Sequence, residues 1–470
     1  MVVRERPPSV LRRSATGRFG NVVRRRVVPL ALAVTMFAVG MAFEFLWIPV
    51  VHHQSRWFTQ GDVWGMLRAA HFVGWGDLGG IYTPGNGVVT FPGMAVLLSP
   101  VAMLSGALHL TESSNGMFLA HPTAVLLVLP VELVLASTVL FAADALAQDF
   151  GVSRKRRAIS CMLIAVLAWP TAALWGHAED ALVVTLALCA MRAAFRGRWV
   201  RAGWLFGCAV VIQPLIALVI PLFLVASPRG GRLLFAVRCG ALSVFAVGVA
   251  FVGNPTGTYR ALVQQPTPPN INHPTPWVAL APRVTSLVAG TSVGSGAAPS
   301  FGRGGFSSYR VTHHAVLVVS GGPGRMIDVL LALLVALYVW RRPQPPIRVL
   351  WLAAAVLASR CFFEAVMTPY YLTPSLILLL VLAARSDAWR LCSAGLLSLG
   401  VSVYAYFDVG PWAWWLPMAA GLTAVLALAF PTADHPVIRS GDDLLGDVVE
   451  PASAFGASNP SDTVMAGSVR

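Results

Sequence analysis

Residues 57–92 read WFTQGDVWGMLRAAHFVGWGDLGGIYTPGNGVVTFP and interrupt a chain that otherwise consists largely of apolar runs. This stretch follows the first apolar run, Val27–Val51, and carries two carboxylates, Asp62 and Asp77, among tryptophans and glycines. The 470 residues include only 20 acidic ones, so two in one aromatic segment require an explanation. We interpret the stretch as a loop outside the membrane, in which residues 62–73 form a short amphipathic surface helix.

The composition assigns the chain to a broad class of protein. Hydrophobic residues make up 56% of it and charged residues 11%, and the mean hydropathy is +0.70. These values exclude an ordinary soluble globular protein. Apolar runs of about 18 residues recur along the chain, without the alternation that a membrane barrel needs. We therefore expect an all-α polytopic integral membrane protein.

The basic residues predict how the chain is oriented. The net charge is +14, but the arginines cluster in short loops between apolar runs, which is an orientation signal rather than a nucleic-acid surface. The clusters place both chain termini in the cytoplasm. We expect a disordered basic segment 1–26, a membrane domain 27–430 with outside loops 52–91 and 254–312, and a disordered acidic tail 431–470.

Two apolar segments cannot cross the membrane completely if every basic loop is cytoplasmic. Pro92–Leu108 is short, and we predict that it is a re-entrant or surface helix. Gly203–Ala226 contains Gln213-Pro214, where proline removes a backbone donor and disfavours helix at the preceding residue. We predict a broken hairpin there, within a bundle of about nine to twelve transmembrane helices.

Acidic residues near membrane spans are candidate functional residues, because a charge at mid-bilayer costs roughly 2.5–3.5 kcal/mol on insertion scales. Glu132 is the mid-span exception, which either faces a cavity or has a partner. On the predicted topology, six carboxylates from separated segments lie near the outer face and could meet in one pocket. They are Glu44, Asp62, Asp77, Glu179, Asp180 and Glu364.

Four of these six residues also have a structural interpretation. Asp62 and Asp180 could be helix N-caps, and Asp77 a plain turn residue between glycines. Arg360 and Glu364 are spaced i, i+4, so they could form a structural ion pair instead of binding phosphate or sugar. Tryptophans and tyrosines of the outside loops could stack on sugar rings or serve as interfacial anchors.

Four segments match a known family in their order along the chain. They are GIYTP…FPGMAVLLSPVAML (Gly80–Leu104), GHAEDAL (Gly176–Leu182), AGWLFGCAVVIQPLIALVIPLFL (Ala202–Leu224) and TPYYLTP (Thr368–Pro374). Their order resembles that of GT-C glycosyltransferases, in particular glycosyltransferase family 87, the polyprenyl-phosphate-mannose-dependent transferases of actinobacteria. The resemblance covers most of residues 57–385. The chain departs from the family at Gln213, where lysine is common, and at Phe91-Pro92-Gly93, where Tyr-Pro-Pro is usual.

The resemblance implies a GT-C-like bundle that transfers a sugar, mannose or arabinofuranose, outside the cytoplasm with inversion. The donor would be a polyprenyl-phosphate sugar and the acceptor a cell-envelope glycolipid or polysaccharide. We assign Asp62 as the general base, and the leaving phosphate requires cationic groups. The candidate substrate-binding residues are Asp77, Tyr82, His177, Glu179, Asp180, Arg283, Arg360, Glu364, Tyr370 and Tyr371.

No cofactor is expected from the sequence. A divalent cation held by Asp62, His177, Glu179 and Asp180 is an open alternative without supporting spacing. The six cysteines stand singly in apolar segments and are interpreted as core residues. The alternative functions are a secondary transporter or lipid flippase, or a non-catalytic membrane scaffold. The expected partners of the transferase are its sugar donor, its acceptor and membrane lipids, with no nucleic acid.

Overall fold

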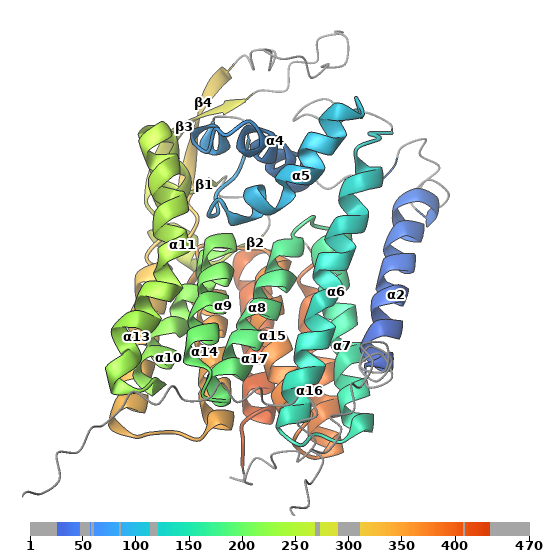
Figure 1. The fold of residues 1–470 in the computed structure, drawn as a ribbon, viewed down its shortest axis with the longest axis vertical. Coiled ribbons are helices and arrows are strands. Elements are labelled where there is room, and N and C mark those ends of the chain that lie inside the picture. Colours follow the sequence, from blue (N-terminus) through green and yellow to red (C-terminus); the bar gives the residue numbers. More distant parts are fainter. Residues whose placement is uncertain are drawn as a thin grey trace, which may run out of the picture.

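A computed structural model describes residues 26–47, 57, 61–83, 86–112, 121–267, 273–289, 311–407 and 409–432. The predicted terminal segments 1–26 and 431–470 lie almost entirely outside these residues. The described chain is mainly helical. Long helices stand side by side as a bundle, and two further helices lie across one end of it (Figure 1). We refer to these two helices, α4 (Gly61–Gly74) and α5 (Gly93–Ala107), together with the described residues between them, as the cap.

The bundle follows the apolar runs of the sequence. Five described helices are long and apolar enough to cross a membrane: Val27–Trp47, Val125–Asp149, Arg229–Gly253, Pro346–Phe363 and Pro411–Leu428. The helices of the bundle are α2 (Val27–Ala42, continued by a π-helical turn Phe43–Trp47), α6 (Val125–Asp149), α7 (Arg154–Ala173), α8 (Ala178–Phe195), α9 (Trp199–Ile212), α10 (Ile220–Ala226), α11 (Arg232–Gly253), α13 (Gly324–Arg341), α14 (Pro346–Phe363), α15 (Thr373–Ala383), α16 (Ala388–Tyr404) and α17 (Pro411–Leu428).

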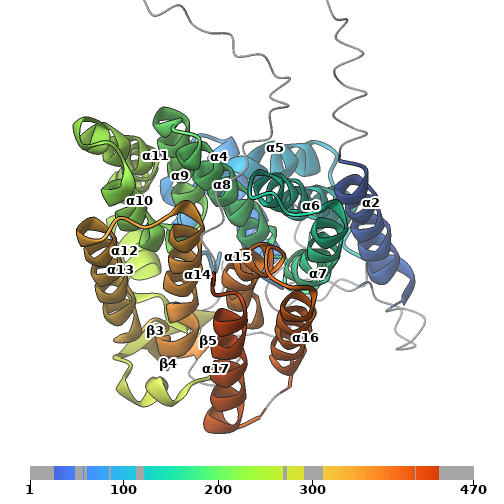
Figure 2. The ribbon, with the colours of Figure 1, turned by 90° about the horizontal axis from the view of Figure 1, so that it is seen from below.

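Helix α15 forms the centre of the bundle. All of its residues are buried, and it packs against α14, α7 and α6 among others. Its sequence, TPSLILLLVLA, is apolar on every side, as expected of a helix surrounded by other helices. The remaining helices are arranged around it when the bundle is viewed along its axis (Figure 2). The central helix also carries the turn Pro369–Leu372 at its N-terminus, which enters the site described below.

The predicted broken hairpin is present. Helix α9 ends at Ile212, Gln213 is extended (φ −140°, ψ 113°), and a 3-10 turn over Pro214–Val219 leads into α10. Because proline cannot donate to the preceding turn, the helix stops there and leaves polar backbone groups near the capped end. Thr90 uses one of them, since its hydroxyl donates to the carbonyl of Ile212 at 3.0 Å.

Helix α4 corresponds to the surface helix predicted over residues 62–73, and α5 to the segment Pro92–Leu108, predicted to be a re-entrant or surface helix. Val63, Leu67 and Ala70 of the predicted apolar face of α4 are buried, and Met66 is partly buried. The face packs against α5 and the core of the bundle. At Gly93 a Cβ atom would lie 2.4 Å from the carbonyl oxygen of Val211, so only glycine permits α5 to begin so close to the α9 break.

Two small antiparallel sheets make the prediction of an all-α chain incomplete. After α12 (Pro255–Tyr259), the long loop contributes β1 (Pro266–Thr267), β2 (His273–Pro274), β3 (Arg283–Ala289) and β4 (Val311–Val319), and β5 (Val366–Met367) follows α14. The strand orders are β1-β4-β3 and β2-β5. Pairing of β2 with β5 holds the long loop against the end of α14, beside the site.

Candidate functional site

A chain of three residues crosses the boundary between cap and bundle. Asp62 lies in the first turn of α4, while His177 directly precedes α8 and Glu179 lies in its first turn. His177 Nε2 donates to Asp62 Oδ2 at 3.0 Å, and its Nδ1 donates to Glu179 Oε1 at 2.5 Å. The carboxylate of Asp62 is thus bonded to the bundle rather than to the N-terminus of its own helix.

The two carboxylates determine the charge of the imidazole. Burial acts to lower the pKa of His177, but Glu179 and Asp62 outweigh it and raise that pKa well above its ordinary value. For Asp62, partial desolvation acts to raise the pKa, but the hydrogen bond and charge of His177 lower it below 3.8. Both groups are therefore ionised at neutral pH. The side chain of Asp62 is 68% exposed, so this carboxylate remains open to a ligand.

Aromatic rings form one wall beside His177. The ring of Tyr370 lies 4.1 Å from the imidazole, centroid to centroid, and tilted by 30°. Trp175 approaches Tyr370 at 5.8 Å and donates from its indole nitrogen to the hydroxyl of Tyr406 at 3.2 Å. An imidazolium facing an aromatic ring gains a favourable electrostatic contact, and the ring limits the positions that the imidazole can take.

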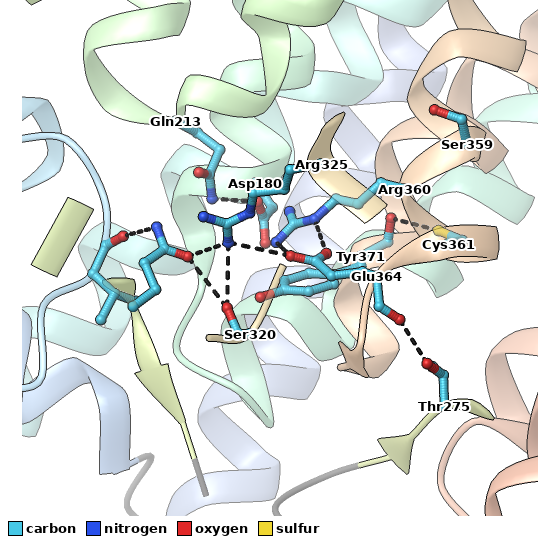
Figure 3. A network of polar contacts seen from close by, with 12 residues as sticks. Asp180, Gln213, Thr275, Ser320, Arg325, Ser359, Arg360, Cys361, Glu364 and Tyr371 are labelled. Carbon is cyan, nitrogen blue, oxygen red and sulfur yellow. Dashed lines mark hydrogen bonds and ion pairs between the residues drawn. The ribbon is translucent and has the colours of Figure 1, made fainter. Parts of the chain in front are cut away.

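Asp180 has a role other than capping its helix. Gln213, at the break after α9, donates from Nε2 to Asp180 Oδ1 at 3.2 Å. The other amide atom, Gln213 Oε1, accepts from the hydroxyl of Thr90 at 3.3 Å, so the break is connected to the segment between α4 and α5. Asp180 lies within electrostatic range of Arg360, as Figure 3 also shows.

The predicted Arg360–Glu364 pair forms and is joined by a second arginine. Arg360 Nη2 donates to Glu364 Oε1 at 3.2 Å and its Nε donates to Oε2. Arg325, at the start of α13, reaches Glu364 Oε1 at 3.3 Å from the other side (Figure 3). The Arg360 guanidinium also lies over the ring of Tyr371, 3.4 Å from its centroid. Two cations thus share one buried carboxylate, and Arg325 remains 35% exposed.

Two more carboxylates lie deeper in the bundle. Glu132 of α6 and Glu44 of the π-helical turn are each 1% exposed. In the described part of the chain, neither oxygen of Glu44 has a hydrogen-bond partner, and Oε2 of Glu132 has none. From the sequence, Glu132 could either face a cavity or have a partner. In the structure its electrostatic neighbours are Glu179, His177 and Glu44.

Three predicted site residues, Asp77, Tyr82 and Arg283, make no side-chain hydrogen bond or ion pair with the charged site residues described above. Asp77 is exposed and accepts from the backbone N–H of Gly80 at 3.0 Å, as a turn residue does. Tyr82 is buried and donates to the carbonyl of Thr90 at 2.9 Å. Arg283 lies exposed on β3, and among the described residues no hydrogen bond or ion pair links it to the others.

Three polar residues of the site were not anticipated from the sequence. Arg325 donates to Gln265 Oε1 and to Ser320 Oγ, the latter at 3.2 Å (Figure 3). Arg325 could have been found by the rule that identified the acids, because it is a charged residue in the first turn of an apolar helix. Gln265 and Ser320 carry no comparable signal, since uncharged polar residues are common in loops.

The possibility of a cation site finds no support in the described residues: no group of three or more His, Cys, Asp and Glu side chains there is arranged to hold a metal ion. Both imidazole nitrogens of His177 are engaged by carboxylates. The six cysteines, all within the described part, are free thiols.

The ionic link between cap and bundle predicts a pH window for stability. A raised pKa of His177 adds stability that is fully present below its unfolded value, near pH 6.5, and is lost as pH rises through the folded value. The lowered pKa of Asp62 adds stability that is present above about pH 3.9 and is lost as pH falls. The difference in unfolding free energy between wild type and His177→Gln should therefore peak between about pH 4 and 6.5. Denaturant unfolding in micelles measures it; a pH-independent difference would contradict the ion pair.

Comparison with models of known protein families finds no match, and comparison with curated protein sequences finds none.

Proposed function

We propose that this chain is a membrane-embedded glycosyltransferase of GT-C type that uses a polyprenyl-phosphate sugar as donor. The observation that carries the proposal is the position of Asp62. Its carboxylate is exposed at the boundary between cap and bundle, and its contact with the partly buried imidazolium of His177 favours the ionised state. A general base must be both ionised and within reach of an incoming hydroxyl. Asp62 combines an exposed side chain with a contact to His177 that favours its ionised form.

In the proposed reaction, Asp62 accepts the proton of an acceptor hydroxyl while the oxygen of that hydroxyl attacks the anomeric carbon. The bond from the anomeric carbon to the phosphate oxygen breaks, and inversion follows because attack and departure occur on opposite faces. His177 orients Asp62 and, through Glu179, is itself held by the bundle. Tyr370 keeps the imidazole in place.

The leaving phosphate carries negative charge that the protein must stabilise. Of the two guanidinium groups that contact Glu364, Arg360 also lies within electrostatic range of Asp180, whereas Arg325 is partly exposed and is the one that can donate to a phosphate. Guanidinium groups suit phosphate because they donate in a planar fork. We assign the phosphate to this side of the site and the acceptor to the side of Asp62.

The proposed orientation places the cap outside the cytoplasm and both termini inside. The basic cluster Arg154–Arg157 begins α7 at the end remote from the cap, as the positive-inside rule requires. Asp149 forms ion pairs with Arg192 and Arg196 at the same end. A polyprenyl-phosphate donor would reach the site from the outer leaflet.

The experiment is a transfer assay in proteoliposomes. Purified protein is supplied with radiolabelled polyprenyl-phosphate mannose or arabinofuranose and envelope glycolipid acceptors. The proposal predicts labelled glycolipid with at least one donor and none with protein-free vesicles. Absence of transfer with every donor and acceptor tried, from protein shown to be folded, would contradict it.

A proton-coupled transporter is the second candidate, and Glu44 and Glu132 favour it. Buried carboxylates without hydrogen-bond partners are typical of proton-coupled membrane proteins. The same vesicles distinguish the two functions: uptake or lipid scrambling that follows a pH gradient, without glycosyl transfer, would support transport. Transfer that is independent of a pH gradient would support the transferase.

A further inference from the structure

Two glutamines connect the cap to the charged residues of the bundle in the same manner. Gln213 Oε1 shares the hydroxyl proton of Thr90 with the carbonyl of Ile212, and Gln213 Nε2 donates to Asp180. Gln265 donates from Nε2 to the carbonyl of Val89 at 2.6 Å and accepts from Arg325 through Oε1. Thr90 and Val89 are neighbours in the segment between α4 and α5. The side-chain amide of Gln213 thus links Thr90 to Asp180, and that of Gln265 links Val89 to Arg325.

The backbone of Gln265 is unusual. Its φ of 40° and ψ of 62° lie in the left-handed region, in which a residue commonly ends a helix, and Gln265 ends the π-helical turn Arg260–Gln264. Glycine is the usual residue at such a position, and glutamine is not. A side chain with a Cβ atom makes this conformation less favourable than it is for glycine, so the contacts around Gln265 help to keep it there. The contacts are present: besides its side-chain bonds, Gln265 accepts at its carbonyl from the N–H of Ser320 at 3.3 Å. Gln265 is therefore held by contacts of both its backbone and its side chain, and its side-chain amide lies between Val89 and Arg325.

The segment that the glutamines hold is closely packed on α4. Asn86 donates to the carbonyls of Gly80 and Ile81 at 3.0 and 3.1 Å. A Cβ atom at Gly65 of α4 would lie only 2.0 Å from the carbonyl oxygen of Asn86, so helix and segment touch backbone to backbone. Displacement of residues 86–90 would thus be transmitted to α4, whose first turn carries Asp62.

We propose that Gln213 and Gln265 are positioning residues that fasten the cap over the bundle and thereby set the location of Asp62 relative to Asp180 and Arg325. Neither glutamine contacts the reacting atoms in this account. Each couples a neutral backbone or hydroxyl group of the cap to a charged group of the bundle. The inference rests on the proposed function for its catalytic consequence, but not for the fastening itself.

The test uses full-length protein in nanodiscs with the variants Gln213→Leu, Gln265→Leu and Gln265→Glu. The glutamate retains the acceptor for Arg325 but loses the donor to Val89. Gln344→Leu is the matched control, because Gln344 is half-buried like the two site glutamines but lies in the turn between α13 and α14, where it donates to the carbonyl of Arg342 at 2.8 Å. Hydrogen–deuterium exchange of residues 61–74 and 86–92 is followed together with steady-state kinetics.

We expect exchange in both segments to be about fivefold faster in all three site variants, as for loss of one hydrogen bond that opposes opening. Exchange in Gln344→Leu should equal wild type. We also expect kcat to fall by about tenfold to a hundredfold, as misplacement of a catalytic group by 1 Å can produce, with KM changed less.

Unchanged exchange of the cap in folded Gln213→Leu and Gln265→Leu protein would overturn the proposal. So would faster exchange in Gln265→Leu with wild-type exchange in Gln265→Glu, because the bond to Val89 is lost in both. If all three variants exchange faster but the wild-type protein transfers no sugar, the fastening of the cap is upheld and the proposed transferase function is refuted. Failure of the fastening and failure of the proposed function therefore give different results.

Discussion

Replacing Asp62 by asparagine should lower the rate of sugar transfer by about 10²- to 10⁴-fold, the range that general acid–base catalysis supplies. The amide is isosteric with the carboxylate and can still contact His177, but it cannot take a proton from the acceptor. Because the side chain is 68% exposed, the loss should occur without loss of fold. Initial rates in proteoliposomes measure the effect, and thermal unfolding of the same samples shows whether the variant is folded.

Asp77→Asn is the matched control for this experiment. It makes the same chemical change in the same aromatic stretch, and asparagine can still accept the backbone hydrogen bond from Gly80. Its transfer rate should stay near wild type. Equal losses in Asp62→Asn and Asp77→Asn would show that Asp62 is not the distinctive base, and an active Asp62→Asn enzyme would reject the assignment outright.

Removal of Arg360 should produce the largest loss of stability. Its guanidinium is shielded on one side by Tyr371 and is paired with Glu364, which is 1% exposed. Removing one partner of a buried ion pair typically costs about 3–5 kcal/mol, because the remaining charge is left without compensation. We expect that loss in Arg360→Met, reduced here to the extent that Arg325 still contacts Glu364. Unfolding free energies in mixed micelles provide the measurement.

The double variant Arg360→Met with Glu364→Gln tests this explanation. With both charges removed, a large part of the lost stability should return, since no charged carboxylate remains at position 364 without Arg360. Asp180 still loses Arg360 as an electrostatic neighbour, so the recovery should be incomplete. Transfer activity should not return, because the phosphate side has lost a cation. Arg283→Met is the control; as an exposed strand residue it should change stability by no more than about 0.5 kcal/mol. A double variant as unstable as Arg360→Met would contradict the ion-pair account.

The helices were predictable because apolar length and proline are local signals. The apolar runs Thr123–Ala147 and Leu233–Gly253 of the sequence correspond to α6 and α11, and the helix breaks at Gln213-Pro214 as predicted. The turn interpretation of Asp77 agrees with its bond to Gly80. The topological argument brought Asp62 and Glu179 near each other from separate segments, and the structure joins them through His177, which that argument did not include.

The details of the site depend on the long loop, which has no periodic pattern. Gln265 owes its place to a left-handed backbone and to contacts with residues 55 and 60 positions later, Ser320 and Arg325. Tyr370 and Tyr371 are adjacent in sequence, yet one faces His177 and the other Arg360, because they lie in a 3-10 turn. Spacing rules for helices and strands do not assign these directions.

The most direct measurement is a double-mutant cycle on transfer rate with Asp62→Asn, His177→Gln and the double variant. If His177 acts through Asp62, His177→Gln should slow wild-type protein clearly and have almost no further effect on Asp62→Asn, with a coupling of about 0.5–3 kcal/mol. Equal effects of His177→Gln in both backgrounds would contradict the account, because the two residues would then act independently.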